Sequence, residues 1–335
     1  MGREITFDLK PLTFDDIPNP SAAPDDFAAF LDAYFAAGER LADSMDEWSD
    51  GGLKENGTVQ IRSLSTGGAH SKLRKSIGVS EFWCGRISSH DAASLRPYAP
   101  DATAPSSMTP LALMRSLSKR LSHDGRRPSA DLDEVARQAR VMSQHPRGIY
   151  EHFRRGLLEY HSEHERDYIE SCRETECLAV LVPHVAEVWR LTYVTPAPTS
   201  PRTFVVLLLS RELAVAPHGQ RRFMNISLPF AHPECPEKRG PEKARVRGKY
   251  VSVERVRELD EGRTEWRMAT SSDAGGSIPR FVTNSALPKS IAEDVPSFLR
   301  WMMKRYSAAG SGSGSGTGTD KAGAADQTPT TAAAT

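Results

Sequence analysis

EWRMATSSDAGGSIPRFVTN, residues 265–284, joins a predicted strand to a predicted helix. The predicted strand runs from Thr264 to Ser271. Gly275-Gly276 ends the extended run because paired glycines favour turns. Pro279 follows at the position that suits the first turn of a helix. This stretch therefore predicts a strand, a glycine turn and a helix in direct succession.

The helix after this turn is predicted to run from Pro279 to Tyr306, interrupted or kinked at Pro288 and Pro296. Steps of three and four place one stripe of side chains on a single face. The members of this stripe are Phe281, Ser285, Pro288, Ala292, Val295, Leu299 and Met302. Because Ser285 and Ala292 are small, we expect the stripe to form the wall of a cavity.

Strand patterns precede this pair of elements. The predicted strands are His184 to Val194, Arg202 to Ser210, Phe223 to Pro229 and Val246 to Leu259. The first and third alternate, whereas the second is nearly continuous in apolar residues, as expected when both faces are covered. Residues 260–263 (DEGR) suit a hairpin turn before the strand at Thr264. Short turns predict an antiparallel sheet.

The N-terminal part begins with an irregular lead-in over residues 1–23. A helix is predicted from Pro24 to about Trp48, with two aspartates in its first turn. Its apolar face consists of Phe27, Phe30, Leu31, Tyr34, Phe35 and Leu41. Two short strands are predicted next, at Thr58 to Leu64 and at Glu81 to Ser88.

Residues 92–145 are predicted to be an insertion of loop and helices. It includes a basic amphipathic helix at Leu111 to Leu121 and another helix at Asp131 to Met142. A longer helix is predicted from Pro146 to Glu170. Residues 307–335 contain Gly, Ser, Thr and Ala with no large apolar side chain, which predicts a disordered tail.

Composition excludes several classes of protein. The 335 residues carry 43 basic and 43 acidic side chains, so a net charge of zero argues against nucleic acid as a partner. The four cysteines form no C-x-x-C pair, which indicates free thiols and no zinc site. The longest apolar run, Phe204 to Leu209, suits a buried strand and is too short for a membrane span. We expect a cytoplasmic protein without a metal or a cofactor.

The order of elements predicts an α+β fold in which a curved antiparallel sheet wraps around a long C-terminal helix. A space between sheet and helix would suit an apolar ligand. Residues 265–284 resemble the last strand and the start of the final helix of START lipid-binding domains. PRTFVVLLL (201–209) and VRGKYVSVERV (246–256) resemble two further strands of those domains. Together they are most similar to an uncharacterised START-like family found chiefly in fungi.

The resemblance covers residues 180–306 well and 24–180 loosely, and it implies a START-like domain of the helix-grip fold over residues 24–306. It also implies binding, transfer or sensing of a hydrophobic molecule such as a lipid, a sterol or a polyketide-like compound, with transient membrane contact. The predicted ligand-binding residues are Trp189, Tyr193, Met224, Ile226, Glu254, Trp266, Arg267, Met268, Phe281, Ser285, Ala292 and Val295.

Two alternatives stay open. An enzyme on the same fold, a cyclase or a hydrolase, could use polar groups on the strands to move a proton. The candidates for this role are His184, Tyr193, Glu254 and Arg267. An interaction scaffold that uses residues 92–145 is the second alternative. His161 and Glu165 are four residues apart on one helix, but without a third ligand they indicate a solvated polar face and no metal site.

Overall fold

The computed structural model describes residues 5–98, 148–194, 199–216, 219–235 and 246–310. The predicted helices at Leu111 to Leu121 and Asp131 to Met142 lie outside these residues, as do most of the insertion and the tail from residue 311. The first seven residues of the 92–145 insertion lie within the described part, and Arg96–Tyr98 form a 3-10 turn there.

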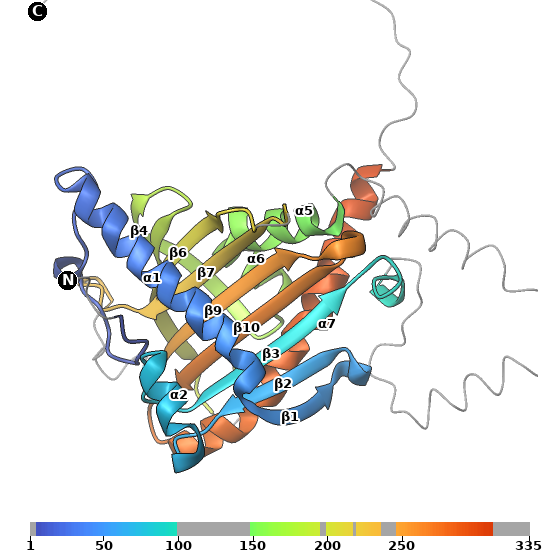
Figure 1. Cartoon of the computed structure of the whole chain (residues 1–335). Coiled ribbons are helices and arrows are strands. Elements are labelled where there is room, and N and C mark those ends of the chain that lie inside the picture. The colour runs from blue at the N-terminus through green and yellow to red at the C-terminus, as the bar shows by residue number, and fades with distance from the viewer. Residues whose placement is uncertain (1–4, 99–147, 195–198, 217–218, 236–245, 311–335) are drawn as a thin grey trace, which may run out of the picture.

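One large sheet dominates the molecule (Figure 1). Its strands are β1 (Ser49–Lys54), β2 (Val59–Leu64), β3 (Trp83–His90), β4 (Cys172–Val182), β5 (Ala186–Tyr193), β6 (Arg202–Leu213), β7 (Arg222–Pro229), β8 (Val246–Arg247), β9 (Lys249–Glu258) and β10 (Thr264–Asp273). Their order is β1-β2-β3-β10-β9-β7-β6-β5-β4, and each neighbouring pair on this path is antiparallel. The two-residue β8 pairs with β6 in parallel.

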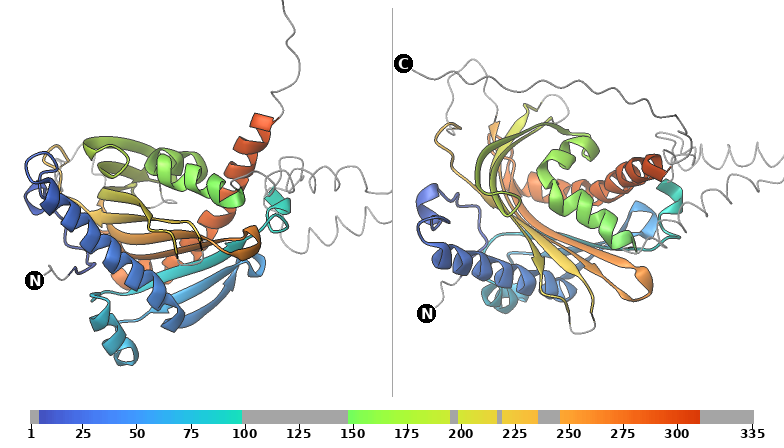
Figure 2. Two further views of the ribbon diagram at one scale, coloured as in Figure 1. Left: turned by 45° about the horizontal axis from the view of Figure 1, so that its top comes forward. Right: turned by 90° about the horizontal axis from the view of Figure 1, so that it is seen from above.

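Helices cover both faces of this curved sheet (Figure 2). On the convex face, α1 (Pro24–Ser44) packs against β7, β9 and β10. On the concave face lie α5 (Gly148–Arg154), α6 (His161–Tyr168) and the long α7 (Arg280–Gly310). The short α2 (Ser71–Ser76) connects β2 to β3. Single 3-10 turns cover Phe14–Asp16, Met45–Glu47, Glu55–Gly57, Gly68–His70 and Asp260–Gly262, and Arg155–Glu159 form a π-helical turn. The predicted α+β helix-grip fold is confirmed.

Two apolar cores follow from the alternation of strand residues. Convex-facing Val251 and Val253 of β9 belong to the same core as the buried face of α1. That face contains all six residues predicted from the sequence. The concave core combines Phe153 of α5 with Val256 of β9 and Phe298 of α7. The sheet is therefore buried on both sides over its centre.

The structure differs from the sequence prediction at both sheet edges. The edge strands β1 and β4 were not predicted; every residue of β1 is exposed, and β4 has only one buried residue. A strand without a buried face lacks the hydrophobic alternation by which strands are recognised. The helix predicted from Pro146 to Glu170 consists of α5, the π-helical turn and α6, with a break at Tyr160. In contrast, α7 continues through Pro288 and Pro296 without interruption.

The glycine turn between β10 and α7 requires its glycines. Gly275 and Gly276 have φ values of +66° and +63°. A Cβ at Gly275 would lie 2.1 Å from the Arg247 carbonyl oxygen. Side chains at positive φ are strained, so this turn can place α7 across the sheet only with glycine here.

The close contact of α1 with the sheet depends on Gly38. A Cβ at this position would lie 2.6 Å from the Met224 sulfur and 3.1 Å from Cδ1 of Ile226. We expect Gly38→Leu to lower the free energy of unfolding by about 1–3 kcal/mol through overpacking. Ala36→Leu, on the exposed face of the same helix, should leave stability nearly unchanged. Urea unfolding checks both variants, and equal stability of the two would contradict this packing.

Candidate functional site

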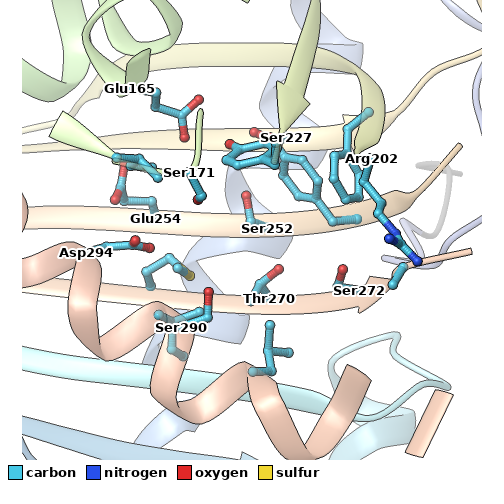
Figure 3. A pocket seen from close by; sticks show the side chains of 18 of the residues that line it. Glu165, Ser171, Arg202, Ser227, Ser252, Glu254, Thr270, Ser272, Ser290 and Asp294 are labelled. Carbon is cyan, nitrogen blue, oxygen red and sulfur yellow. The ribbon is translucent and has the colours of Figure 1, made fainter. Parts of the chain in front are cut away.

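A cavity of about 320 Å³ lies between the concave face of the sheet, α6 and α7. Figure 3 shows side chains from all three directions pointing into it. Its apolar walls are formed by Ile169, Val194, Phe204, Met268, Ile278, Leu287 and Ile291, and its aromatic hydroxyl groups come from Tyr168, Tyr193 and Tyr250. The volume lies in the range of pockets that hold small molecules.

The space exists because small side chains lie next to one another across the sheet. Ser252 of β9 is paired with Ser227 of β7 on one side and with Thr270 of β10 on the other. All three point into the cavity (Figure 3). Thr270 also donates from Oγ1 to the Val251 carbonyl oxygen at 3.0 Å. A row of short hydroxyl side chains leaves room that longer residues would fill.

The adjacent row of the sheet carries charge. Glu254 of β9 is paired with Asn225 of β7 and with Met268 of β10, which in turn is paired with Arg86 of β3. Glu254 accepts a hydrogen bond from Nε1 of Trp266 at 2.7 Å, and its Oε1 lies 3.6 Å from Nη2 of Arg86. The Arg86 guanidinium lies 3.7 Å from the centre of the Trp266 ring. Such stacking partly replaces lost hydration of the cation.

Arg86 is only 1% exposed, and burial lowers the pKa of its guanidinium, although Glu254 opposes this effect. Its Nε and Nη1 have no hydrogen-bond acceptor among the described residues. A buried cation is stable only when it is paired. The contact with Glu254 and the Trp266 ring therefore holds Arg86 in its place.

The π-helical turn contributes a second polar group. The Leu157 carbonyl oxygen accepts hydrogen bonds from Nδ1 of His161 and from Nδ2 of Asn225, both at 2.9 Å. Asn225 Nδ2 also lies 3.2 Å from Oε2 of Glu254. With Nδ1 of His161 donating, Nε2 faces Oε1 of Glu165 at 3.9 Å. π-Helical turns are frequent where a fold positions functional groups.

Two carboxyl groups of the cavity titrate near neutral pH. Burial raises the pKa of Glu165 to about 7, with Glu254 adding to the shift and His161 opposing it. Burial also raises the pKa of Asp294 on α7 to about 7, opposed by Arg86 and increased by Glu165 and Glu254. In Figure 3 both lie at the same end of the cavity as Glu254. Strongly shifted groups that converge in a cavity are typical of functional sites.

The structure places the predicted ligand-binding residues in three different environments. Tyr193, Glu254 and Met268 line the cavity. Trp189 and Trp266 belong to clusters on the concave side but do not line it. Trp266 is covered by Phe153 and Phe298, at ring distances of 5.6 and 5.1 Å.

Met224, Ile226 and Arg267 point away from the cavity, contrary to the sequence prediction. Met224 and Ile226 are buried in the convex core beneath α1. Arg267 donates from Nη1 to the Ala42 carbonyl oxygen at 3.2 Å and to Asp46 at 3.0 Å, also on the convex side. On β7 the cavity-facing residues are instead Asn225 and Ser227. A strand shows alternation but does not show which of its two faces meets a cavity.

The predicted stripe on the final helix is also displaced. Phe281 is 73% exposed and Ser285 lies on the surface, where it donates to the Val282 carbonyl oxygen. Ala292 and Val295 are completely buried in the concave core and do not line the cavity. The cavity wall of α7 is formed by Leu287, Ser290, Ile291 and Asp294. The cavity therefore meets the neighbouring face of the helix.

Of the candidates for proton transfer, Tyr193 and Glu254 line the cavity, whereas Arg267 does not. His184 lies in a turn at φ +58°, and its ring contacts that of Tyr160. Within the described residues, no group of three or more His, Cys, Asp or Glu side chains is arranged to hold a metal ion. All four cysteines are free thiols.

The prediction of a solvated face at His161 and Glu165 is wrong, since their side chains are only 11% and 12% exposed. Both line the cavity. One signal could have found them: the steps Phe153, Leu157, His161, Glu165 continue a buried stripe at a spacing of four. Arg86, Asn225 and Asp294 were also missed as cavity residues, and no motif marks them.

Fold and cavity together define a helix-grip protein with a partly polar internal cavity. The chain belongs to the family described as "Protein of unknown function (DUF3074)", whose model matches residues 135–302. No curated protein matches the sequence.

Several solved structures are similar at low identity. Human STARD10 has 12% identity and a TM-score of 0.49, covering 83% of this chain and 82% of that one. Human StAR-related lipid transfer protein 5 has 13% identity and a TM-score of 0.44, covering 81% and 99%. A STAR-related lipid transfer protein from Xanthomonas axonopodis has 11% identity and a TM-score of 0.39, covering 76% and 98%.

The raised carboxyl pKa values predict how stability depends on pH. Between about pH 4 and pH 7 the unfolded chain loses the protons of Glu165 and Asp294 while the folded protein keeps them. The folded state therefore loses stability as pH rises through this window, by roughly 1–3 kcal/mol per group. Glu165→Gln and Asp294→Asn should each reduce the fall in melting temperature between pH 5 and pH 8.

The matched control is Glu163→Gln on α6, whose side chain is exposed. It should show the same pH dependence as the wild type. If Glu165→Gln and Asp294→Asn also follow the wild-type curve, the two carboxyl groups are already ionised in the folded protein at pH 5.

Proposed function

We propose that this protein binds one hydrophobic small molecule in the cavity between the sheet and α7. The observation that carries the proposal is the cavity itself, which is built by the short Ser227, Ser252 and Thr270 side chains under α7. Its apolar walls suit a hydrophobic ligand. A lipid, a sterol or a polyketide-like compound fits this description.

The walls support an amphipathic ligand. Burial raises the pKa of the Tyr193 and Tyr250 phenol groups well above the usual value for tyrosine. Both hydroxyl groups therefore stay neutral. Neutral phenols offer an apolar ring together with one hydrogen-bond donor. The apolar part of the ligand would lie against Phe204, Ile291 and these rings, with its polar part at Glu254.

We further propose that the ligand is exchanged at a membrane surface, as a carrier or a sensor requires. Val194 and Ile278 line the cavity, and Val194 is 42% exposed. Phe281 and Val282, which follow Ile278 by three and four residues, are 73% and 41% exposed. Exposed apolar side chains beside a cavity suit contact with lipid. No helix among the described residues is long and apolar enough to span a membrane; a cytoplasmic location stays a prediction.

A second candidate function is a cyclase or a hydrolase of a hydrophobic metabolite. One observation favours it: Glu165 and Asp294 have pKa values near 7, where a carboxyl group can act as a general acid or base. The buried Cys84 and Cys172 offer no nucleophile, because burial raises the pKa of each thiol to about 12. Mass spectrometry of the extracted ligand, before and after incubation with the protein, distinguishes a carrier from an enzyme.

A cavity-filling substitution tests the binding function. Ser252→Phe should place its ring in the open space, abolish binding of a fluorescent fatty acid or sterol, and change the free energy of unfolding by less than about 1 kcal/mol. Ala292→Phe, in the packed core, should cost about 1–3 kcal/mol and retain binding while folded. Energy transfer from tryptophan measures binding. Unchanged binding by Ser252→Phe would show that the ligand lies elsewhere.

A surface substitution tests the membrane contact. Phe281→Asp should slow transfer of a fluorescent lipid between vesicles at least severalfold, because it removes an exposed apolar side chain and adds charge. The equilibrium affinity for the lipid should stay within about twofold of the wild type. Lys289→Asp, on the exposed surface of the same helix, is the charge control. Equal transfer rates for wild type and Phe281→Asp would remove Phe281 from the contact.

A further inference from the structure

The polar end of the cavity has more acidic than basic side chains. Glu165 from α6, Glu254 from β9 and Asp294 from α7 converge there (Figure 3). Two arginines line the cavity within the described residues. Nη2 of Arg86 lies 3.6 Å from Oε1 of Glu254 and is therefore at this end, whereas Arg202 lies at the other end (Figure 3). We propose that the ligand is an amphiphile whose protonated amine binds to these three carboxyl groups. This inference rests on the proposed binding function.

Arg86 does not balance the whole cluster. Its Nη2 lies 3.6 Å from Glu254, and its guanidinium is stacked on Trp266. Glu165 has only His161 as an ion-pair partner, at 3.9 Å. Asp294 has no ion pair within 4 Å among the described residues, although Arg86 lowers its pKa in part. Because Arg86 and Glu254 neutralise each other, the two partly buried carboxyl groups of Glu165 and Asp294 have no full counter-charge. Ionised carboxyl groups in an apolar setting are unstable unless a cation joins them.

Unpaired acceptors point in the same direction. Asn225 lines the cavity and is only 2% exposed, and its Oδ1 has no donor among the described residues. Its Nδ2 donates to the Leu157 carbonyl oxygen and to Glu254, which settles the orientation of the amide. Oε2 of Glu165 is likewise buried and unpaired. An ammonium group supplies three N–H donors and no acceptor, so it can donate to Oδ1 of Asn225 and to Oε2 of Glu165.

The titration of the site supports an amine. Burial raises the pKa of Glu165 and Asp294 to about 7. A bound cation would lower both pKa values, and the two carboxyl groups would then release protons. An alkylamine stays protonated up to about pH 9. Its affinity should therefore rise between pH 5.5 and pH 8. The titratable and charged groups facing Glu165 and Asp294 are His161 and Tyr168 of α6, Cys172 of β4, Tyr193 of β5, Tyr250 and Glu254 of β9, Arg86 of β3 and Glu293 of α7.

The test compares three ligands with the same alkyl chain: dodecylamine, dodecanol and dodecanoate, each below its micellar concentration, by calorimetry on the full chain. At pH 8 we expect dodecylamine to bind about tenfold more tightly than dodecanol, with dodecanoate weakest. Its affinity should fall at least about fivefold at pH 5.5, while that of dodecanol should not. Repeating the titration in two buffers of different ionisation enthalpy should reveal proton release on amine binding.

Variants locate the effect. Glu165→Gln and Asp294→Asn should each remove most of the preference for dodecylamine over dodecanol. Glu163→Gln, on the exposed face of α6, should keep the preference.

The outcomes separate the two proposals. Equal binding of dodecylamine and dodecanol, or tighter binding of dodecanoate, would overturn the amine site and leave a hydrophobic cavity in place. Failure of all three ligands to bind would overturn the amine site and count against the proposed function as well. The wild-type series decides even if a variant fails to fold.

Discussion

The pairing of β10 with both β3 and β9 is the interaction on which the rest of the molecule depends. Seven residues of β10, Thr264 to Thr270, are paired with His90 to Cys84 on one side and with Glu258 to Ser252 on the other. This central strand joins the N-terminal strands to the C-terminal ones across more than 170 residues of sequence. It also ends in the glycine turn that directs α7 over the concave face. Without this strand there would be neither a continuous sheet nor a helix above it.

The sheet separates two tasks between its faces. On the convex face, Val251 and Val253 pack beneath α1 in a closed apolar core. On the concave face, the same strand presents Ser252 and Glu254 to the cavity. Because successive side chains point in opposite directions, one strand can contribute both to stability and to a binding site. A short side chain at Ser252 therefore leaves the packing of the convex face unchanged.

The charged end of the cavity is expensive to maintain. Glu165 and Asp294 lose hydration in the folded protein, and the pKa of each rises to about 7 as a result. A chain selected only for stability would replace such groups with apolar residues. Together with Asn225 and Glu254, they form a set of hydrogen-bond acceptors to which a polar group of a ligand could donate. The cost in stability and the proposed specificity have the same physical origin, which is burial of unbalanced charge.

The sequence by itself determined the helix-grip order, the buried face of α1 and the positions of the central strands. These depend on periodicity, prolines and glycines, which act over a few neighbouring residues. It did not reveal the edge strands β1 and β4, because exposed strands have no apolar alternation. Only the tertiary structure decided that Met224 and Ile226 face α1, and that Asp294 rather than Ala292 faces the cavity. Periodicity in the sequence shows which residues share a face. The rotation of α7 about its axis, and the element that packs on each face of the sheet, are instead set by packing between elements far apart in the chain.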